Sequence, residues 1–399
     1  MSTVDLTDPR FWIRTDVHEH VAELRRQAPV QWHEAGADGP SWAVLSHRHA
    51  MEVLADADTY SSAGGSLLGG GPNPPAGSGR MMALTDAPDH RTLRDRAHRF
   101  FSPKGVARLE RRVRDLTVEL IERALEKETV DFVTEVAAVV PMTLVCELMQ
   151  VPDADRPEVT RLCDEAFLMS SPERRRAAHQ GLFAYLLDLA VERRARPGDD
   201  LVSAFAAEIE GSPSLSLEDV VLNCDNIIVG GVQTVRHTAA MSLHTLIRRP
   251  QSWCELSEAG ASPQAAVEEL LRWTSVGVHV LRTARRDAAL GGRTVRAGDR
   301  VVVWIPSANR DETVFDRPGE LDLSRRPNRH LALGWGPHFC IGAVLARLEL
   351  RILLEELVAR VGVMEQTGPA VPALSIINLG LASLPVRLGR HRPDTRRIA

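Results

Sequence analysis

The chain has 399 residues, of which 44% are hydrophobic and 25% are charged, a composition that is ordinary for a globular protein with a large core. Its formal net charge is -5, and its arginines are spread through helical patterns instead of forming one basic block, which argues against a nucleic-acid partner. The opening MSTVDLTDPRFW does not resemble an export leader and no apolar run is long enough to span a membrane, so we expect a cytoplasmic protein without membrane contact.

Helical periodicity dominates the chain. After Ser102 and Pro103, which suit a helix start, apolar residues recur at spacings of three and four and predict an amphipathic helix. In chain order, the other predicted elements are a strand at 41–45, helices at 130–149, 172–194, 217–249 and 263–273, paired strands at 290–295 and 300–305, a helix at 340–361 and strands within 373–388. We therefore expect a mainly α protein with small β-sheets (α+β), and a single domain over 1–399, since no repeat or composition shift marks a boundary.

One long segment, SSAGGSLLGGGPNPPAGSG at Ser61–Gly79, is too rich in Gly, Pro and Ser for a regular element. A surface linker and a lid over a substrate entrance fit this composition equally well.

Five cysteines are present, an odd number without a CxxC pair, so we expect no disulfide framework and four small core residues. The fifth, Cys340, lies in LGWGPHFCIGAVLARLEL, a glycine-punctuated loop that leads into a helical pattern. A buried thiol, a nucleophile and a metal ligand all fit an isolated cysteine. The loop supplies backbone N–H donors and the positive potential of a helix N-terminus, both of which favour a metal-binding thiolate.

This loop resembles the haem-binding signature of the cytochrome P450 family, Phe-Gly-x-Gly-x-His-x-Cys-x-Gly. The matching residues are Gly334, Gly336, His338, Cys340 and Gly342, while Leu333 stands where the family has Phe. The resemblance covers nearly the whole chain. It implies the cytochrome P450 fold with a single haem-binding domain, a haem b cofactor (iron protoporphyrin IX), and Cys340 as the metal ligand, with His338 and Gly342 beside the cofactor.

The resemblance extends to residues that would surround the haem. In AVEELLRW, Glu269 and Arg272 match the family's ExxR pair, whose role is structural. Glu320 stands where the family commonly has the third partner, an Arg, and Arg325 is a candidate replacement. The residues at the family's positions for contacts to the haem propionates are His90, Arg94, Arg282 and His330.

The resemblance also implies that 217–249 is the long helix over the distal face of the haem, with Gly230 and Gly231 giving room for oxygen and substrate. The family's catalytic acid and alcohol follow these glycines and guide protons for O–O bond cleavage. Thr234 keeps the alcohol, whereas Gln233 replaces the acid, and an amide cannot act as a general acid near neutral pH. His237, one turn further on, is either an alternative proton carrier or a packed core residue.

The implied function is an enzyme: an oxidoreductase and monooxygenase that inserts one oxygen atom from O2, by hydroxylation or epoxidation, into a medium-sized natural-product intermediate of secondary metabolism. Electrons would come from a ferredoxin and a ferredoxin reductase, with NAD(P)H as the source, and the ferredoxin would meet arginines such as Arg99 and Arg347. We expect a monomer and a small-molecule substrate, free or tethered to a carrier protein. The expected substrate-contacting residues are Val229, Val232, Val278 and Ile377, with His279 as a polar anchor.

Two alternatives stay open. Gln233 also suits a haem-thiolate enzyme of atypical chemistry, such as oxidative coupling, desaturation or peroxide-driven oxidation. A haem-containing binding or sensor protein without turnover is the second alternative, and the retained Thr234 speaks against it.

Overall fold

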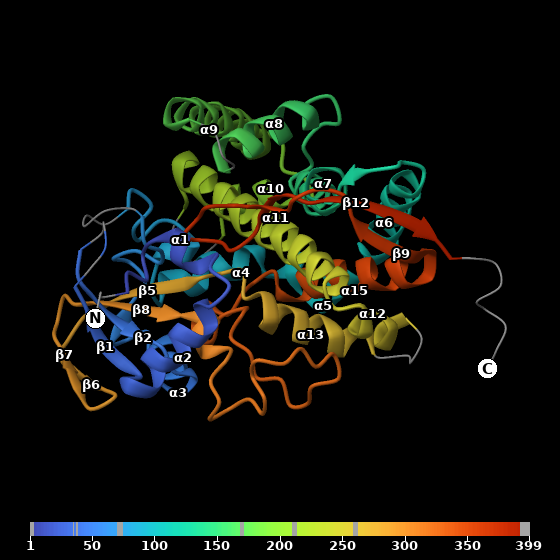
Figure 1. Ribbon diagram of the computed structural model, residues 1–399. Coiled ribbons are helices and arrows are strands. Elements are labelled where there is room, and N and C mark those ends of the chain that lie inside the picture. Colours follow the sequence, from blue (N-terminus) through green and yellow to red (C-terminus); the bar gives the residue numbers. More distant parts are fainter. Residues whose placement is uncertain are drawn as a thin grey trace.

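The computed structural model describes residues 4–34, 36, 39–69, 75–167, 171–209, 214–257 and 262–391. Helices form most of the body, and the small sheets lie at its sides, the largest next to the N-terminal segments (Figure 1). The mainly α fold with small sheets is therefore as predicted. Among the described helices, none is both long enough and apolar enough to cross a membrane.

The helices range in length from 4 to 31 residues. They are α1 (Pro9–Trp12), α2 (Val17–Gln27), α3 (His47–Ala55), α4 (Asp89–Phe101), α5 (Pro103–Ala107), α6 (Glu110–Leu125), α7 (Val139–Leu148), α8 (Arg156–Phe167), α9 (Pro172–Ala195), α10 (Leu201–Ala206), α11 (Leu217–Ile247), α12 (Pro250–Ser257), α13 (Pro263–Thr274), α14 (Ile305–Ala308) and α15 (Ala343–Arg360). Three short turns of other helical types are η1 (Met82–Leu84), η2 (Val133–Ala137) and η3 (Gly336–His338).

The strands form four small sheets. They are β1 (Val30–His33), β2 (Ser41–Val44), β3 (Tyr60–Ser61), β4 (Val130–Asp131), β5 (His279–Ala284), β6 (Ala288–Leu290), β7 (Arg293–Val295), β8 (Arg300–Trp304), β9 (Val361–Gln366), β10 (Val371–Pro372), β11 (Leu381–Ser383) and β12 (Pro385–Arg390). The largest sheet has the order β1-β2-β8-β5-β3, and the others are β4-β12-β9, β10-β11 and β6-β7.

Two stretches differ from the sequence prediction. The segment 130–149 is not one helix: β4 comes first, then η2, then α7, because Val130 and Asp131 pair with β12 from the far end of the chain. The segments 290–295 and 300–305 do not pair with each other either. Gly291 and Gly292, both with positive φ, turn the chain so that β6 pairs with β7, while β8 joins β2 and β5.

The long helix α11 runs through the middle of the body (Figure 1). It begins at a capping box in which Ser216 Oγ accepts from the Asp219 N–H and the Asp219 carboxylate accepts from the Ser216 N–H. It packs against α7, α9, α13 and α15, so buried residues occur on nearly all of its faces.

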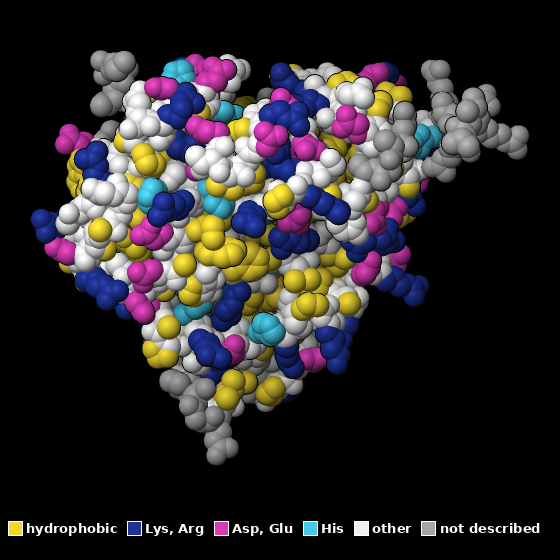
Figure 2. Space-filling view, turned by 90° about the horizontal axis from the view of Figure 1, so that it is seen from below, with side chains coloured by type: hydrophobic (Ala, Val, Ile, Leu, Met, Phe, Trp, Pro, Cys, Tyr) yellow, Lys and Arg dark blue, Asp and Glu magenta, His cyan; other side chains and the backbone are white. Residues whose placement is uncertain are grey.

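Charged side chains of both signs are interspersed on the face seen from below, and a band of apolar side chains crosses its centre (Figure 2). No field of a single sign covers this face. This agrees with the absence of a basic block in the sequence.

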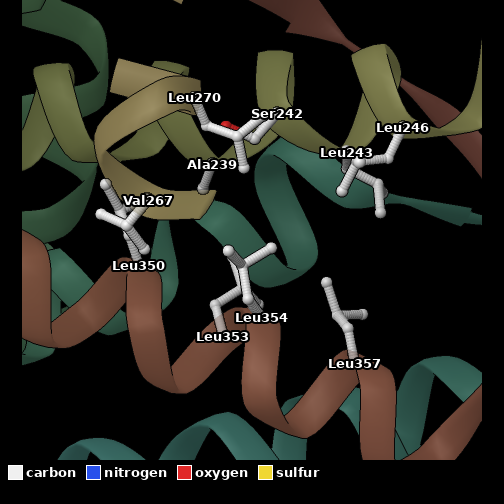
Figure 3. Close-up of a pocket in the computed structure, with 10 residues that line it drawn as sticks. All are labelled: Ala239, Ser242, Leu243, Leu246, Val267, Leu270, Leu350, Leu353, Leu354 and Leu357. Atoms are coloured by element: carbon white, nitrogen blue, oxygen red, sulfur yellow. The ribbon is translucent and has the colours of Figure 1, made fainter. Parts of the chain in front are cut away.

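A small cavity of about 10 Å³ lies between α11, α13 and α15 (Figure 3). Nine of its ten lining residues are apolar, and the tenth is Ser242, whose buried Oγ has no hydrogen-bond partner among the described residues. This volume is at the lower limit for one water molecule, so the cavity is a packing feature of the core rather than a ligand site.

A buried network fixes the loop that precedes Cys340. The Glu269 carboxylate accepts from Arg272 Nε and Nη2 at 2.8 and 2.7 Å and from Arg325 Nε at 3.1 Å. Asn328 Nδ2 and the Asp322 N–H also donate to it, at 3.0 and 2.9 Å. The prediction that Arg325 is the third partner is therefore confirmed.

A second buried acid, Glu349 on α15, lacks such compensation. Its Oε2 has no partner among the described residues, and it lines a cavity of about 20 Å³ with apolar residues and Thr117. Burial raises the pKa of this carboxyl well above its usual range, so Glu349 is neutral in the folded protein.

Replacing Glu349 with Gln should raise the free energy of unfolding at pH 8. The unfolded carboxyl ionises above about pH 4.5 while the folded one stays protonated, so wild-type stability falls as pH rises, by up to about 1.4 kcal/mol per pH unit. Denaturant unfolding between pH 4 and 8 measures this slope. Glu349→Gln should flatten it, the exposed Glu128→Gln should not, and equal slopes in all three proteins would refute a neutral Glu349.

Candidate active site

The loop that carries Cys340 is held in one conformation by its glycines. Gly334 and Gly336 have φ of +73° and +71°, a backbone conformation that residues with a side chain rarely adopt. A Cβ on Gly336 would also lie 2.3 Å from the Leu54 carbonyl oxygen on α3, so only glycine fits there. The Cys340 N–H donates to the Leu333 carbonyl at 2.9 Å, which closes the loop just before α15.

The Cys340 side chain is half-buried, and the desolvation of its thiol raises the pKa, while a hydrogen bond from the Gly342 backbone and the cations Arg94 and Arg347 lower the pKa. A thiolate at this place therefore needs a further positive charge on its sulfur, which a bound metal provides. The described residues contain no group of three or more His, Cys, Asp or Glu side chains that could hold a metal ion.

Four side chains from three segments gather near this loop, and we call them the cationic cradle. They are His90 and Arg94 on α4, Arg282 on β5 and His338 on η3. The His90 and His338 rings lie 4.0 Å apart between centroids, and Arg94 Nη2 donates to the Phe339 carbonyl next to Cys340 at 2.7 Å. The sequence expected all four as cofactor contacts, and the fold brings them together.

The electrostatics of the cationic cradle favour an anion. Burial lowers the pKa of Arg282 to about 10. Burial, then the charges of Arg282 and His90, lower the pKa of His338 to about 3. His90 Nε2 is buried and has no partner among the described residues. Two carboxylates of the kind that haem carries would relieve this repulsion and supply the missing acceptors, so the residues fit the propionates.

His330 does not join the cationic cradle. Its Nε2 contacts Glu268 Oε2 at 3.1 Å, and its Nδ1 accepts from the Ala332 N–H at 3.3 Å. A neutral imidazole has one N–H, which Glu268 takes, so these contacts leave His330 no donor for a propionate. Glu268 also binds Arg347 through two hydrogen bonds of 2.6 and 2.8 Å.

Further residues that no sequence motif indicates complete this region. Ser62 Oγ lies 3.1 Å from His338 Nε2, and the buried Asp86 accepts from Ser61 Oγ, the Ser62 N–H and Arg285. Asp86 precedes His90 by one helical turn, but spacing alone does not distinguish it from a surface acid. The sequence likewise does not distinguish Glu268, which precedes the ExxR glutamate Glu269, from a surface acid.

On α11, Gly230 and Thr234 border open space. A Cβ on Gly230 would meet nothing within 4 Å, and the Thr234 hydroxyl donates to the Gly230 carbonyl at 2.7 Å. Gln233 is buried, and both atoms of its amide lack partners among the described residues. His237 is packed: it has a hydrogen bond with the backbone of Leu381, and burial lowers its pKa to about 4.

The expected substrate contacts divide into two groups. Val229 is half-buried and Ile377 is 36% exposed, so both border accessible space. Val232 and Val278 are buried in apolar clusters and lie behind that surface. His279 is also buried, and both of its ring nitrogens already have backbone partners, so it is not free to anchor a substrate.

Comparison with known proteins places the chain in a family. The cytochrome P450 family model matches residues 263–382. Cytochrome P450 NovI from Streptomyces niveus is 34% identical over 97% of both chains, and linalool 8-monooxygenase from Pseudomonas putida is 31% identical over 90% of this chain and 93% of its own. The solved structure of P450 OxyD, which is involved in the biosynthesis of vancomycin-type antibiotics, aligns with a TM-score of 0.90 and 34% identity over 97% of this chain and 100% of its own.

The chain belongs to the cytochrome P450 family. It is therefore an oxidoreductase of the P450 monooxygenase class, and the family implies a haem cofactor.

Replacing Arg282 with Met should weaken haem retention. A charge-assisted hydrogen bond contributes about 1.5–3 kcal/mol, which corresponds to roughly 10- to 100-fold faster haem loss. Transfer of haem to excess apomyoglobin measures the rate, and far-ultraviolet circular dichroism checks the fold. The exposed Arg296→Met is the matched control, and a wild-type rate in Arg282→Met would contradict the cationic cradle's assignment.

Proposed function

We propose that this P450 uses haem b, held by the Cys340 thiolate, to insert one oxygen atom from O2 into a medium-sized natural-product intermediate. The observation that carries the proposal is the convergence of the cationic cradle beside the half-buried thiol of Cys340. The open space at Gly230 and Thr234 supports the distal side of the same assignment.

In this proposal each group of residues has a distinct task. Bound haem would supply oxygen activation, favoured by electron density from the thiolate. Cys340 would hold the iron, and the Gly342 N–H would share the negative charge of the sulfur. His90, Arg94, Arg282 and His338 would bind the propionates and so fix the orientation of the ring.

Proton delivery would rest on water and the alcohol. The Thr234 hydroxyl gives its hydrogen to the Gly230 carbonyl, so its oxygen remains an acceptor toward the open space. Gln233 carries no titratable proton, but its two unpaired amide atoms are suited to hold ordered water molecules. Burial lowers the pKa of His237 to about 4, so its imidazole is neutral near pH 7 and does not serve as the titrating acid of this route.

The similarity to OxyD supports a substrate from secondary metabolism, and we propose that this substrate is either free or tethered to a carrier protein. OxyD is involved in antibiotic biosynthesis, and linalool 8-monooxygenase is named for a small terpenoid. Val229 and Ile377 would contact the substrate, with Val232 and Val278 as support behind them.

We propose a ferredoxin and a ferredoxin reductase as electron donors, with NAD(P)H as the source and a cytoplasmic monomer as the working form. The two arginines named from sequence are already engaged: Arg99 pairs with Asp199 at 3.1 Å and Arg347 with Glu268. A ferredoxin at this face would therefore compete with these carboxylates for the arginines.

Gln233 is the one feature that favours a second candidate, a haem-thiolate enzyme that performs oxidative coupling, desaturation or peroxide-driven oxidation. A binding or sensor protein without turnover is less favoured, because the Thr234 hydroxyl borders the open space at Gly230.

The test combines spectroscopy with turnover. The reduced protein with CO should absorb near the position typical of thiolate ligation, and Cys340→Ser should lose this band while retaining helical content. Titration with polyketide, terpenoid and peptide compounds, followed by product analysis with a surrogate ferredoxin pair, then finds the substrate class. A wild-type protein without the thiolate band, or oxygen-independent products, would overturn the proposal.

Replacing Gln233 with Glu should change the coupling of NAD(P)H consumption to product at least about twofold while leaving substrate affinity nearly unchanged, because the new group can titrate. Product per NAD(P)H and the dissociation constant from Soret shifts are the measurements. The control Gln233→Met removes the amide without adding an acid. An unchanged yield of product per NAD(P)H in Gln233→Glu would refute the proposal that residue 233 governs proton delivery.

A further inference from the structure

His279 lies where three segments far apart in the sequence meet. It opens β5, and on one side of β5 runs the loop 62–69, which continues from β3. The segment 376–379 runs beside residues 276–278, just before β5, where the Val278 N–H donates to the Ile377 carbonyl at 3.1 Å and the Leu379 N–H donates to the Val276 carbonyl at 2.7 Å. The buried His279 ring reaches both neighbours.

The two ring nitrogens of His279 each have a backbone partner. Nε2 accepts from the Leu68 N–H at 2.7 Å, and Nδ1 lies 3.0 Å from the Ile376 carbonyl oxygen. An amide N–H can only donate and a carbonyl can only accept, so these contacts require the neutral tautomer with the proton on Nδ1. The imidazole therefore links two chain segments that form no ladder with each other.

The loop 62–69 is also attached at other points along its length. Its start is fixed by Ser62 to Asp86, and it returns to β5 through the Leu281 N–H, which donates to the Ser66 carbonyl at 2.8 Å. Gly65 and Gly69 adopt positive φ, and glycines give a loop little intrinsic rigidity. Leu68 is buried in an apolar cluster with Leu281 and Leu379, so side-chain packing adds to the hydrogen bond that its N–H donates to His279.

The far end of the C-terminal segment is fixed by another histidine. His237 on α11 bonds to the backbone of Leu381, and its ring packs so tightly on Gly380 that a Cβ there would lie 2.3 Å from it. The segment 376–381 is thus held at one end by His279 and at the other by His237. Ile377, which borders the accessible space, lies between them.

We propose that His279 is a positioning residue, a clasp that holds the loop 62–69 and the segment 376–379 closed around the entrance to the substrate chamber. This rests on the proposed function for the identity of the chamber, but the clasp itself is a property of the hydrogen bonds. Its neutral imidazole gives one donor and one acceptor to backbone atoms, and it does not contact the substrate.

Three variants separate the two bonds. His279→Phe keeps an aromatic ring at this position and removes both hydrogen bonds. His279→Gln can place an acceptor near the Nε2 position for Leu68, and His279→Asn can place a donor near the Nδ1 position for Ile376. Leu68→Ala is the matched control, since it removes side-chain packing and keeps the N–H that His279 accepts.

Hydrogen–deuterium exchange of the holoenzyme is the first readout. His279→Phe should raise exchange at least about tenfold in peptides covering 62–69 and 376–379, with peptides from α9 unchanged. His279→Gln should restore protection in the first peptide, and His279→Asn in the second. Wild-type protection in His279→Phe, or equal loss in Leu68→Ala, would overturn the clasp.

The second readout is the association rate of 4-phenylimidazole, a ligand for haem iron, followed by the Soret band. Opening the entrance should raise this rate several-fold in His279→Phe, with Leu68→Ala near wild type. Faster exchange with an unchanged rate would refute control of the entrance. A wild-type protein without a haem spectrum would refute the proposed function instead, and the exchange data would still decide the clasp.

Discussion

The structure depends most on the full satisfaction of one buried carboxylate. Glu269 is completely buried, and an ion in that position destabilises the fold unless every lone pair has a donor. Arg272 and Arg325 provide charge, and their remaining N–H groups donate to backbone carbonyls, including that of Asn309. The Asn309 side chain accepts from the Leu331 N–H, two residues before the carbonyl that holds Cys340. The position of the sulfur is therefore set by a chain of bonds that begins at Glu269.

The sequence predicted well those elements whose ends are determined locally. The helices α9, α11, α13 and α15 lie within a few residues of their predicted ranges, because caps, prolines and apolar spacing act over one or two turns. The segment 130–149 could not be predicted in this way. Its first residues form β4 only because β12 lies beside them, and partners more than 250 residues away leave no local signal.

The candidate site shows the same limit at the level of single side chains. The motif order placed Cys340, His90, Arg94, Arg282 and His338 correctly near one another, since the family resemblance fixes their positions along the chain. It did not distinguish the tasks of the other histidines. His330 bonds to Glu268 and His279 to two backbone segments, and the partner of an imidazole nitrogen depends on tertiary contacts that spacing does not encode.

The bonds of His279 to Leu68 and Ile376 go to main-chain atoms of the two segments that it joins. The side chains of 62–69 and 376–379 can therefore vary in size and polarity while these two hydrogen bonds stay the same. In evolutionary terms, the side chains that line the chamber can diversify while the main-chain hydrogen bonds of His279 stay the same. Substitutions in these two segments can therefore accommodate new substrates without loss of the contact between the segments. A library that varies these two segments and keeps residue 279 would use the same freedom in the laboratory.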